Sequence, residues 1–356
     1  MTNTKHGVSA LEAQRADFPL IFDIRAIAAS TPIMPTARPV SADELTSNPD
    51  RFIESTEIPV LIVCDIGVRS AVVTDLLRAA GYSQTVSLEG GMEGWIATGL
   101  PLFSPVGLTP EEYRRYDRQL KLPDFGVAGQ QALGNARVAV VGAGGLGAPV
   151  LAYLAAAGVG SLTIIDSDDV EVSNLHRQPI YRTKDVGEGK ARRAADFVAA
   201  LNPEVAVEAR SLRLDDTNAL EVLAGHDIVV TCTDSFDTAH AINAAAVELG
   251  IPLVFGSVYR TEGQLAVFDA RSGPCYACVF PFDADGSSLS CSIVGVLGPV
   301  TGVVGSMQAG EVVKLLTDIG DSSGRRLGLY DSRTQTMDSV SIRKNPACPV
   351  CGGAGD

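Results

Sequence analysis

A chain of 356 residues is long enough to form two domains, each with its own hydrophobic core. Its formal net charge of −14 argues against a nucleic-acid-binding protein, because contact with a phosphate backbone needs a surplus of lysine and arginine. The N-terminus lacks the apolar core of a signal peptide, and the two long uncharged stretches, 138–165 and 289–310, are interrupted by glycines. We therefore expect a cytoplasmic protein that does not span a membrane and binds no nucleic acid.

The first hundred residues alternate predicted strands and helices. Residues 1–15 show no periodic pattern, and we expect them to be mobile. Apolar runs at 20–24, 59–63 and 85–88 predict buried strands, and helices are predicted at 41–48, 70–80 and around Trp95. Ser41 and Glu44 have the spacing of a capping box at the start of the first of these helices. The pattern predicts a small α/β domain over residues 1–101 and a proline-containing linker at 102–110.

Cys64 ends the strand predicted at 59–63 and begins the segment Cys-Asp-Ile-Gly-Val-Arg-Ser. The N–H groups of such a loop, the dipole of the helix that follows and Arg69 would favour a thiolate, and a buried unreactive cysteine is the alternative. This segment and the later Leu88-Glu-Gly-Gly-Met-Glu-Gly-Trp95 resemble the rhodanese-like family over residues 10–103. The resemblance implies that Cys64 and Arg69 act in sulfur transfer, although the segment after Arg25 departs from the family pattern.

A second predicted domain occupies residues 111–356 and begins with a charged helix at 111–119. From Arg137 onward, strands and helices alternate again. Strands are predicted at 138–141, 161–165, 205–209, 227–231 and 252–256, with helices between them. This order predicts an α/β fold with a Rossmann-like doubly wound sheet. Further strands at 262–268 and 325–330 predict an antiparallel extension of that sheet.

A glycine-rich turn follows the strand at 138–141 directly and leads into an alanine-rich helix. Such a turn presents backbone N–H groups and a helix N-terminus to phosphate oxygens, and Asp166, at the end of the next strand, can hydrogen-bond a ribose hydroxyl. Because glycine turns of this kind bind NAD as well as ATP, the cations Arg177 and Lys190 are decisive, and they favour a triphosphate. The glycines of the turn are Gly142, Gly144, Gly145 and Gly147.

From Leu108 onward the chain resembles the ThiF/MoeB family of adenylating enzymes, the bacterial relatives of ubiquitin-activating enzymes. The resemblance depends on the order of several motifs: Arg115-Tyr-Asp-Arg118-Gln, the glycine turn, the run Asp166–Gln178, Cys232-Thr-Asp234 and two Cys-x-x-Cys pairs. It implies ATP and Mg²⁺ as ligands. By this resemblance Asn174, Arg177 and Lys190 contact the phosphates, Asp234 binds Mg²⁺ with Asp168 as a weaker candidate, and Arg118 enters the ATP site of the neighbouring subunit in a homodimer.

The seven cysteines include two Cys-x-x-Cys pairs, which predict a closed structural Zn²⁺ site in a reducing compartment. Redox-active cysteine pairs are the alternative. Cys291 follows a polar segment that corresponds to a crossover loop of the family. The resemblance implies that it receives the activated carrier or its sulfur, and a loop thiol without a role is the alternative. Cys232 follows an apolar strand and is expected in the core. The predicted zinc ligands are Cys275, Cys278, Cys348 and Cys351.

The two resemblances together imply ATP-dependent adenylation of the C-terminal Gly-Gly carboxylate of a small ubiquitin-like sulfur carrier protein. Persulfide sulfur, loaded on Cys64 by a donor such as a cysteine desulfurase, would then convert the carrier to a thiocarboxylate. One alternative is a ubiquitin-like-protein activating enzyme that forms a thioester at Cys291. The others are a scaffold with a degenerate rhodanese domain and, least favoured, an NAD-dependent dehydrogenase.

Overall fold

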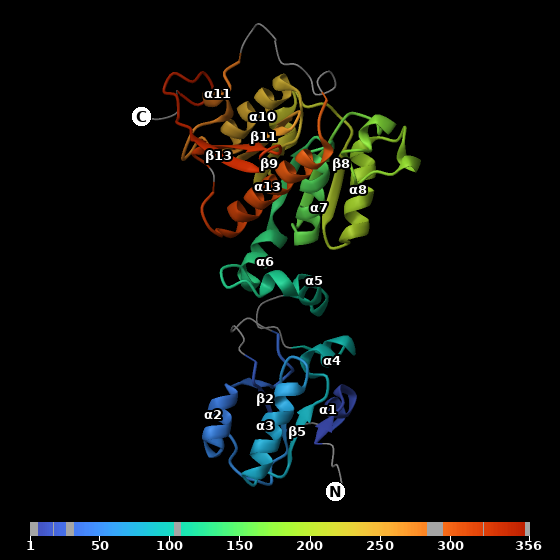
Figure 1. The fold of residues 1–356 in the computed structure, drawn as a ribbon, viewed down its shortest axis with the longest axis vertical. Helices are drawn as coiled ribbons and strands as arrows, with labels where there is room; N and C mark the ends of the chain where they lie inside the picture. The colour runs from blue at the N-terminus through green and yellow to red at the C-terminus, as the bar shows by residue number, and fades with distance from the viewer. Residues whose placement is uncertain are drawn as a thin grey trace. The chain divides into compact units, whose positions relative to one another are not determined.

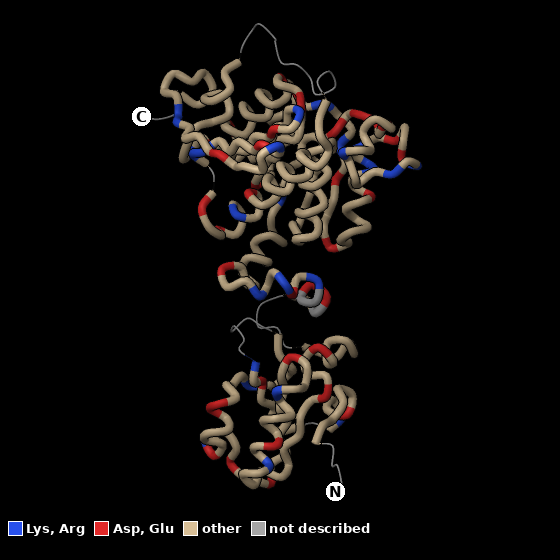
Figure 2. Tube along the Cα trace, viewed as in Figure 1, with Lys and Arg blue, Asp and Glu red and all other residues tan. Residues whose placement is uncertain are grey.

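The computed structural model describes residues 6–16, 18–25, 32–102, 108–282, 295–322 and 324–352, and it contains two compact units, 1–121 and 122–356 (Figure 1). Acidic and basic residues are interspersed along the chain in both units (Figure 2). None of the helices within these ranges is long and apolar enough to cross a bilayer.

The first unit contains a five-stranded sheet in the order β1-β5-β4-β2-β3, and all neighbouring strands are parallel. Every residue of the central strand β4 is buried, because apolar side chains cover both faces of the sheet. Ser41 accepts a hydrogen bond from the backbone N–H of Glu44, so the predicted N-cap is confirmed. The strands are β1 (Gly7–Val8), β2 (Leu20–Asp23), β3 (Arg38–Pro39), β4 (Val60–Val63) and β5 (Thr85–Leu88). The helices are α1 (Ala10–Ala16), α2 (Ala42–Ser47), η1 (Pro49–Arg51), α3 (Val68–Ala79) and α4 (Gly91–Ala97).

The expectation that residues 1–15 are mobile and without regular structure is wrong for residues 7–8, which form β1, and for residues 10–15, which lie in α1. β1 pairs with the edge of β5, so its two residues are held by backbone hydrogen bonds that no periodic pattern reveals. Helix α1 begins after Ser9, whose N–H and hydroxyl both donate to the carboxylate of Glu12. The spacing Ser-x-x-Glu is a capping signal that could have predicted this helix.

The second unit contains an eight-stranded sheet in the order β13-β12-β11-β10-β9-β6-β7-β8. The five strands from β10 to β8 are parallel to one another, whereas β10, β11, β12 and β13 pair antiparallel. This arrangement confirms the doubly wound sheet with an antiparallel extension. The strands are β6 (Arg137–Val141), β7 (Ser161–Ile165), β8 (Ala206–Arg210), β9 (Ile228–Thr231), β10 (Leu253–Tyr259), β11 (Glu262–Phe268), β12 (Arg326–Asp331) and β13 (Thr336–Ser341).

Helices cover both faces of this sheet (Figure 1). Val138 and Val140 of β6 point into a core formed with α7, α8 and α13, whereas Ala139 and Val141 point into a core formed with α9 and α10. The last helix of the first unit is α5 (Pro110–Leu120). The helices of the second unit are α6 (Gly126–Asn135), α7 (Gly147–Ala157), η2 (Val172–Asn174), η3 (Thr183–Asp185), α8 (Lys190–Leu201), α9 (Ala219–Leu223), α10 (Phe236–Leu249), α11 (Tyr276–Val279) and α13 (Gly298–Thr317).

The strand order reverses at β6. From β6 the chain proceeds to β7 and β8 on one side, and later returns to β9 and β10 on the other side. The connections therefore diverge at the carboxyl ends of β6 and β9, and in open α/β sheets ligands bind in the crevice at such a point. The glycine turn follows β6 there, and Asp234 follows β9.

Candidate functional site

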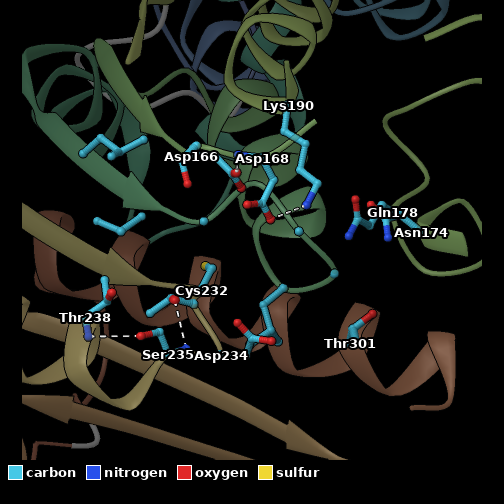
Figure 3. Close-up of a pocket in the computed structure, with 18 of the residues that line it drawn as sticks. Asp166, Asp168, Asn174, Gln178, Lys190, Cys232, Asp234, Ser235, Thr238 and Thr301 are labelled. Carbon is cyan, nitrogen blue, oxygen red and sulfur yellow. Dashed lines mark hydrogen bonds and ion pairs between the residues drawn. The ribbon is translucent and has the colours of Figure 1, made fainter. Parts of the chain in front are cut away.

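A cavity of about 750 Å³ lies at the carboxyl ends of β6, β7 and β9 (Figure 3). Its volume lies within the range of pockets that hold small-molecule ligands. Its lining is rich in polar groups: glycines after β6, acidic residues after β7 and the segment Thr233–Ser235 after β9. The lining includes Gly142, Gly144, Gly145, Asp166, Asp168, Asn174, Arg177, Lys190 and Asp234 from the predicted set.

The glycine turn needs its glycines for two different reasons. Gly142 has a φ of +96°, and a Cβ there would lie 2.7 Å from the carbonyl oxygen of Cys232. Gly144 and Gly145 expose their backbone to the cavity. Gly147, predicted with them, is not part of the lining; a Cβ at that position would collide with the carbonyl of Gly142, so Gly147 lets the first turn of α7 close onto the loop.

Asp166 connects the loops that follow β6 and β7. One carboxylate oxygen accepts the N–H of Ala143 at 2.7 Å, and the other accepts the N–H of Asp168 at 2.8 Å. Burial raises the pKa of this carboxyl, although the two backbone hydrogen bonds oppose that shift. Each oxygen keeps a further lone pair, so the fixed carboxylate can still accept a hydrogen bond from a ligand hydroxyl.

Lys190 begins α8, and its side chain is 9% exposed. Its ammonium lies 2.8 Å from a carboxylate oxygen of Asp168, whose own side chain is 67% exposed (Figure 3). The backbone N–H of Lys190 also donates to the carbonyl of Asp168. The cation is therefore held at the cavity by a carboxylate that solvent can reach.

The segment around η2 supplies amide and guanidinium groups to the same cavity. Asn174 is buried, and its side-chain oxygen accepts the N–H of Glu171. Arg177 is held by a hydrogen bond from its guanidinium to the carbonyl of Ser173. Gln178 is 3% exposed, and its side-chain oxygen has no hydrogen-bond partner among the residues that the structure describes. Gln178 is the last residue of the run Asp166–Gln178, and the sequence assigns it no role of its own.

The segment after β9 forms the opposite wall (Figure 3). Asp234 is exposed there, and Ser235 caps α10 by accepting the N–H of Thr238. Arg213, which the sequence did not single out, also lines the cavity and lies within 3.5 Å of the Ser235 hydroxyl. Cys232 is buried in the core as predicted, and burial raises the pKa of its thiol.

In the first unit, Cys64 lies at the end of β4 and is 1% exposed. Its sulfur accepts the backbone N–H of Ser70 at 3.3 Å, and the Ser70 hydroxyl lies at the same distance. Gly67, with a φ of +86°, allows the loop to turn into α3. The guanidinium of Arg69 donates to the carbonyl of Ile24, 3.3 Å away. The loop therefore gives the sulfur one backbone N–H donor, from Ser70, whereas the Arg69 guanidinium binds a backbone carbonyl and not the sulfur.

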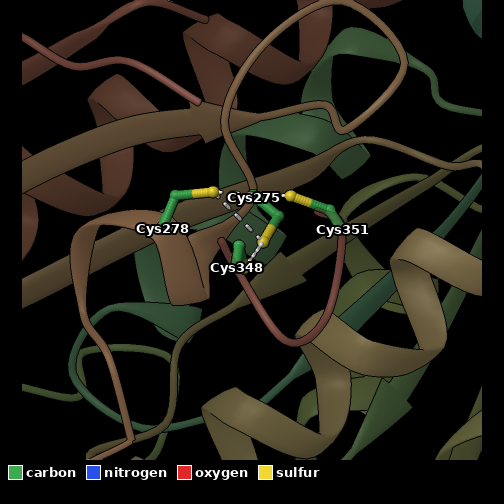
Figure 4. A group of neighbouring side chains, drawn as sticks. All are labelled: Cys275, Cys278, Cys348 and Cys351. Carbon is green, nitrogen blue, oxygen red and sulfur yellow. Dashed lines mark hydrogen bonds between the residues drawn. The ribbon is translucent and has the colours of Figure 1, made fainter. Parts of the chain in front are cut away.

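The four cysteines predicted to bind zinc converge (Figure 4). Their sulfurs all lie within 4.8 Å of one another, with separations of 3.8, 3.6 and 3.4 Å for three of the pairs. Four thiolates at the tetrahedral Zn–S distance of about 2.3 Å would lie about 3.8 Å apart, so the donor set and its spacing fit Zn²⁺. Asn243 supports the site, because its amide N–H₂ lies 3.8 Å from the sulfur of Cys275 and its oxygen accepts the N–H of Tyr276.

Of the predicted catalytic residues, Arg118 is not among those that line the cavity. Arg118 lies on α5 with its side chain 88% exposed, 3.5 Å from the carboxylate of Asp117. Cys291 lies outside the described residues.

Comparison with known proteins agrees with both resemblances. Residues 116–350 match the ThiF family, and residues 8–98 match the rhodanese-like domain. The interval between the two matches contains the linker predicted at 102–110. A sulfur carrier protein adenylyltransferase of Thermus thermophilus is 50% identical over 68% of this chain and 92% of its own length. The SAMP-activating enzyme E1 of Haloferax volcanii is 46% identical over 70% of this chain and 93% of its own.

One further relative and one solved structure add to this comparison. The probable adenylyltransferase/sulfurtransferase MoeZ of Mycobacterium tuberculosis is 45% identical over 70% of this chain and 65% of its own length. The crystal structure of E. coli MccB with ATP matches with a TM-score of 0.60 and 25% identity, over 67% of this chain and 75% of that one. The chain belongs to the ThiF family and carries a rhodanese-like domain before its ThiF domain.

Proposed function

We propose that this protein is an adenylyltransferase and sulfurtransferase that activates the C-terminal carboxylate of a small sulfur carrier protein. The observation that carries the proposal is the cavity, where a glycine turn, the fixed carboxylate of Asp166 and the cation of Lys190 meet. This combination suits a nucleoside triphosphate better than a dinucleotide, because a dehydrogenase has no need for a cation held at this place.

ATP would lie with its phosphates on the glycine turn and its ribose at Asp166. Lys190, Arg177 and Asn174 would contact the phosphates, and the exposed partner of Lys190, Asp168, can turn into solvent when a phosphate replaces it. Gln178 offers a buried amide oxygen to a donor on the nucleotide or on an ordered water molecule.

Mg²⁺ fits the wall after β9, because carboxylate oxygen is the ligand that this hard cation prefers and Asp234 presents one to the cavity. Asp234 would hold the ion, and Asp168 is the weaker candidate because Lys190 already engages one of its oxygens. When bound, Mg²⁺ supplies positive charge that neutralises the phosphates. Zn²⁺ would be held by the four cysteines in a closed shell with no open position, so its role would be structural.

Adenylation needs positioning and charge neutralisation and little else from the protein. A carboxylate oxygen of the carrier would attack the α-phosphorus of ATP, the bond between the α- and β-phosphates would break, and pyrophosphate would leave. The N–H groups of the glycine turn and the cations Lys190 and Arg177 would hold the phosphate oxygens throughout. The carrier's end then carries AMP as a leaving group.

Sulfur transfer would use Cys64. The outer sulfur of a Cys64 persulfide would attack the carrier's carbonyl carbon, release AMP and leave the carrier joined to Cys64 through an S–S bond. A second thiol, from this chain or from a small thiol in solution, would reduce that bond and release the carrier as a thiocarboxylate. That thiol ends in a disulfide with Cys64, and a further thiol then breaks this disulfide and releases Cys64 as a thiolate, which the backbone N–H of Ser70 would stabilise.

We infer that a protein supplies the persulfide. Ile66 in the loop is 55% exposed, and Val68, the first residue of α3, is 62% exposed. Asp65 is exposed as well. An apolar and acidic surface suits a protein-borne persulfide, such as that of a cysteine desulfurase, better than a small anion such as thiosulfate.

A homodimer is the assembly that we propose. A groove of about 830 Å³ on α7 and α13 is lined mainly by apolar side chains, among them Pro149, Tyr153, Val303 and Met307, and Tyr153 is 59% exposed. A second copy could cover this face. The exposed Arg118 would then be available to the ATP site of the partner subunit. A cytoplasmic location follows from the reduced cysteines that this chemistry requires.

The experiment that tests the function is intact-mass analysis of a recombinant small ubiquitin-like protein ending in Gly-Gly. It is incubated with MgATP, a persulfide-loaded cysteine desulfurase and either the native chain or the Cys64→Ala or Cys291→Ala variant. Replacement of one oxygen by sulfur, a gain of about 16 Da, that is lost with Cys64→Ala supports the proposal. A carrier linked to Cys291 as a thioester would instead support the alternative of a ubiquitin-like-protein activating enzyme.

A further inference from the structure

A short chain of buried hydroxyl groups leads from β5 to the sulfur of Cys64. The Ser70 hydroxyl lies 3.3 Å from that sulfur and 2.8 Å from the hydroxyl of Ser87 on β5. It also lies 3.2 Å from the carbonyl oxygen of Gly67. Cys64, Ser70 and Ser87 are all nearly inaccessible to solvent, so the protons of these hydroxyls must be given to protein acceptors.

The number of protons determines which hydroxyl donates in each of these hydrogen bonds. Ser87 has one hydroxyl proton, and the Ser70 oxygen is its one hydrogen-bond partner among the described residues. Ser87 therefore donates to Ser70, since otherwise a buried donor would be left without an acceptor. Ser70 must then give its own proton to Gly67 or to Cys64, and an anionic sulfur is the stronger acceptor of the two.

We propose that Ser87 is a positioning residue for sulfur transfer at Cys64. By donating to Ser70 it directs the Ser70 hydroxyl proton toward the sulfur and polarises that hydroxyl. Ser87 does not touch the sulfur, and it acts through Ser70. The inference rests on the proposed function, because it gives the hydroxyl chain a role in loading and releasing sulfane sulfur.

The step that the hydroxyl chain assists is a thiol exchange without net oxidation. The Cys64 thiolate attacks the outer sulfur of a donor persulfide, the donor's S–S bond breaks, and its electron pair leaves on the donor thiolate. A new S–S bond forms at Cys64. A hydrogen bond from Ser70 stabilises the Cys64 anion before this step, and again when Cys64 is the leaving group.

The same strand offers a matched control. Thr85, two residues before Ser87 on β5, is fully buried, and its hydroxyl has no hydrogen-bond partner in the described part of the chain. Thr85→Val removes a buried hydroxyl with almost no change in shape and does not touch the chain that leads to Cys64. A difference between Ser87→Ala and Thr85→Val therefore reports the hydrogen bond and not the loss of a polar group from β5.

The test compares the full-length chain with Ser70→Ala, Ser87→Ala, the double variant and Thr85→Val. The rate of Cys64 alkylation by iodoacetamide is followed against pH by peptide mass spectrometry, beside the rate of persulfide loading from a cysteine desulfurase. Ser87→Ala should slow both about two- to tenfold near pH 7 and move the alkylation profile to higher pH. The double variant should match Ser70→Ala, and Thr85→Val should match the native chain.

A Ser87→Ala profile equal to the native one would overturn the proposal, as would additive effects of Ser70→Ala and Ser87→Ala, because Ser87 would then not act through Ser70. If Ser87→Ala does not fold, as judged by thermal melting, Ser87→Cys keeps the shape of the side chain, with a somewhat larger atom, and weakens the donor. The alkylation profile needs no carrier. If Cys64→Ala still yields thiocarboxylate, the proposed function fails while the profile still decides the role of Ser87.

Discussion

The ammonium of Lys190 lies 2.8 Å from the carboxylate of Asp168, and the pair is unequal, since the lysine is buried and the aspartate is largely exposed. Removing one member therefore differs from removing the other. Without Asp168 a buried cation loses its partner, whereas without Lys190 an exposed carboxylate is simply hydrated. The same asymmetry favours a cation that is kept at the cavity for an incoming phosphate.

Lys190→Met should therefore cause the larger loss of activity, and Asp168→Asn the larger loss of stability. We expect Lys190→Met to lower carrier-dependent ATP–pyrophosphate exchange by about 100-fold or more, because a phosphate contact is lost, and Asp168→Asn to lower it by less than about tenfold. In thermal unfolding without nucleotide, Asp168→Asn should be the less stable of the two. Exchange rates that fall equally in both variants would show that the pair acts as a unit.

Replacing Gln178 should not destabilise the free protein, but it should reduce the stabilisation that MgATP provides. Its buried oxygen has no partner among the described residues, so Gln178→Met should leave the melting temperature of the free protein unchanged or raise it by a few degrees, about 1 kcal/mol. The additional stabilisation by MgATP should be smaller than in the native chain. Thermal melting with and without MgATP measures both, and Thr85→Val is the control for a buried polar group of the first unit, which does not line the cavity. An unchanged response to MgATP would remove Gln178 from the nucleotide site.

The elements that the sequence predicts well are those whose residues are buried on both faces. β4, β6, β7 and β9 are short apolar runs, and all four strands lie where the pattern predicts. β13 was missed because all of its residues are exposed, so it shows no alternation of apolar and polar side chains. Its position depends on pairing with β12, which is a tertiary contact.

Site residues were missed for a related reason. Gln178 and Arg213 belong to the cavity because of where their loops lie, and neither has a spacing that marks it in the sequence. Asp166 and Lys190 were found because a carboxylate and a cation at those distances from a glycine turn have a chemical meaning. The hydroxyl chain from Ser87 to Cys64 joins a strand to a loop and could be seen only in the fold.

His226 should make stability depend on pH. It is buried between the carbonyl of Leu223 and the hydroxyl of Thr163, and burial lowers the pKa of its imidazole. Because the folded pKa lies below the unfolded value of about 6.5, the stabilisation is present above that value and is lost as the pH falls through the folded pKa. As the pH is lowered below about 6.5, the melting temperature of His226→Gln should decrease less than that of the native chain. His6→Gln, which changes a more exposed histidine, is the control, and equal pH profiles for all three proteins would contradict the prediction.

The four-cysteine cluster should hold the C-terminal segment in place. Cys348 and Cys351 lie far along the chain from Cys275 and Cys278, so a metal shared by the two pairs fixes residues 342–352 beside α11. The native protein should bind about one zinc per chain. Cys351→Ser should lose most of this zinc, melt at a lower temperature and have a C-terminal segment that proteases cleave. Zinc is measured by mass spectrometry of the acid-digested protein and cleavage by peptide mapping. Cys64→Ser, which changes a cysteine outside the cluster, should keep its zinc. A Cys351→Ser protein that retains zinc and resists cleavage would show that the cluster does not fix the C-terminal segment.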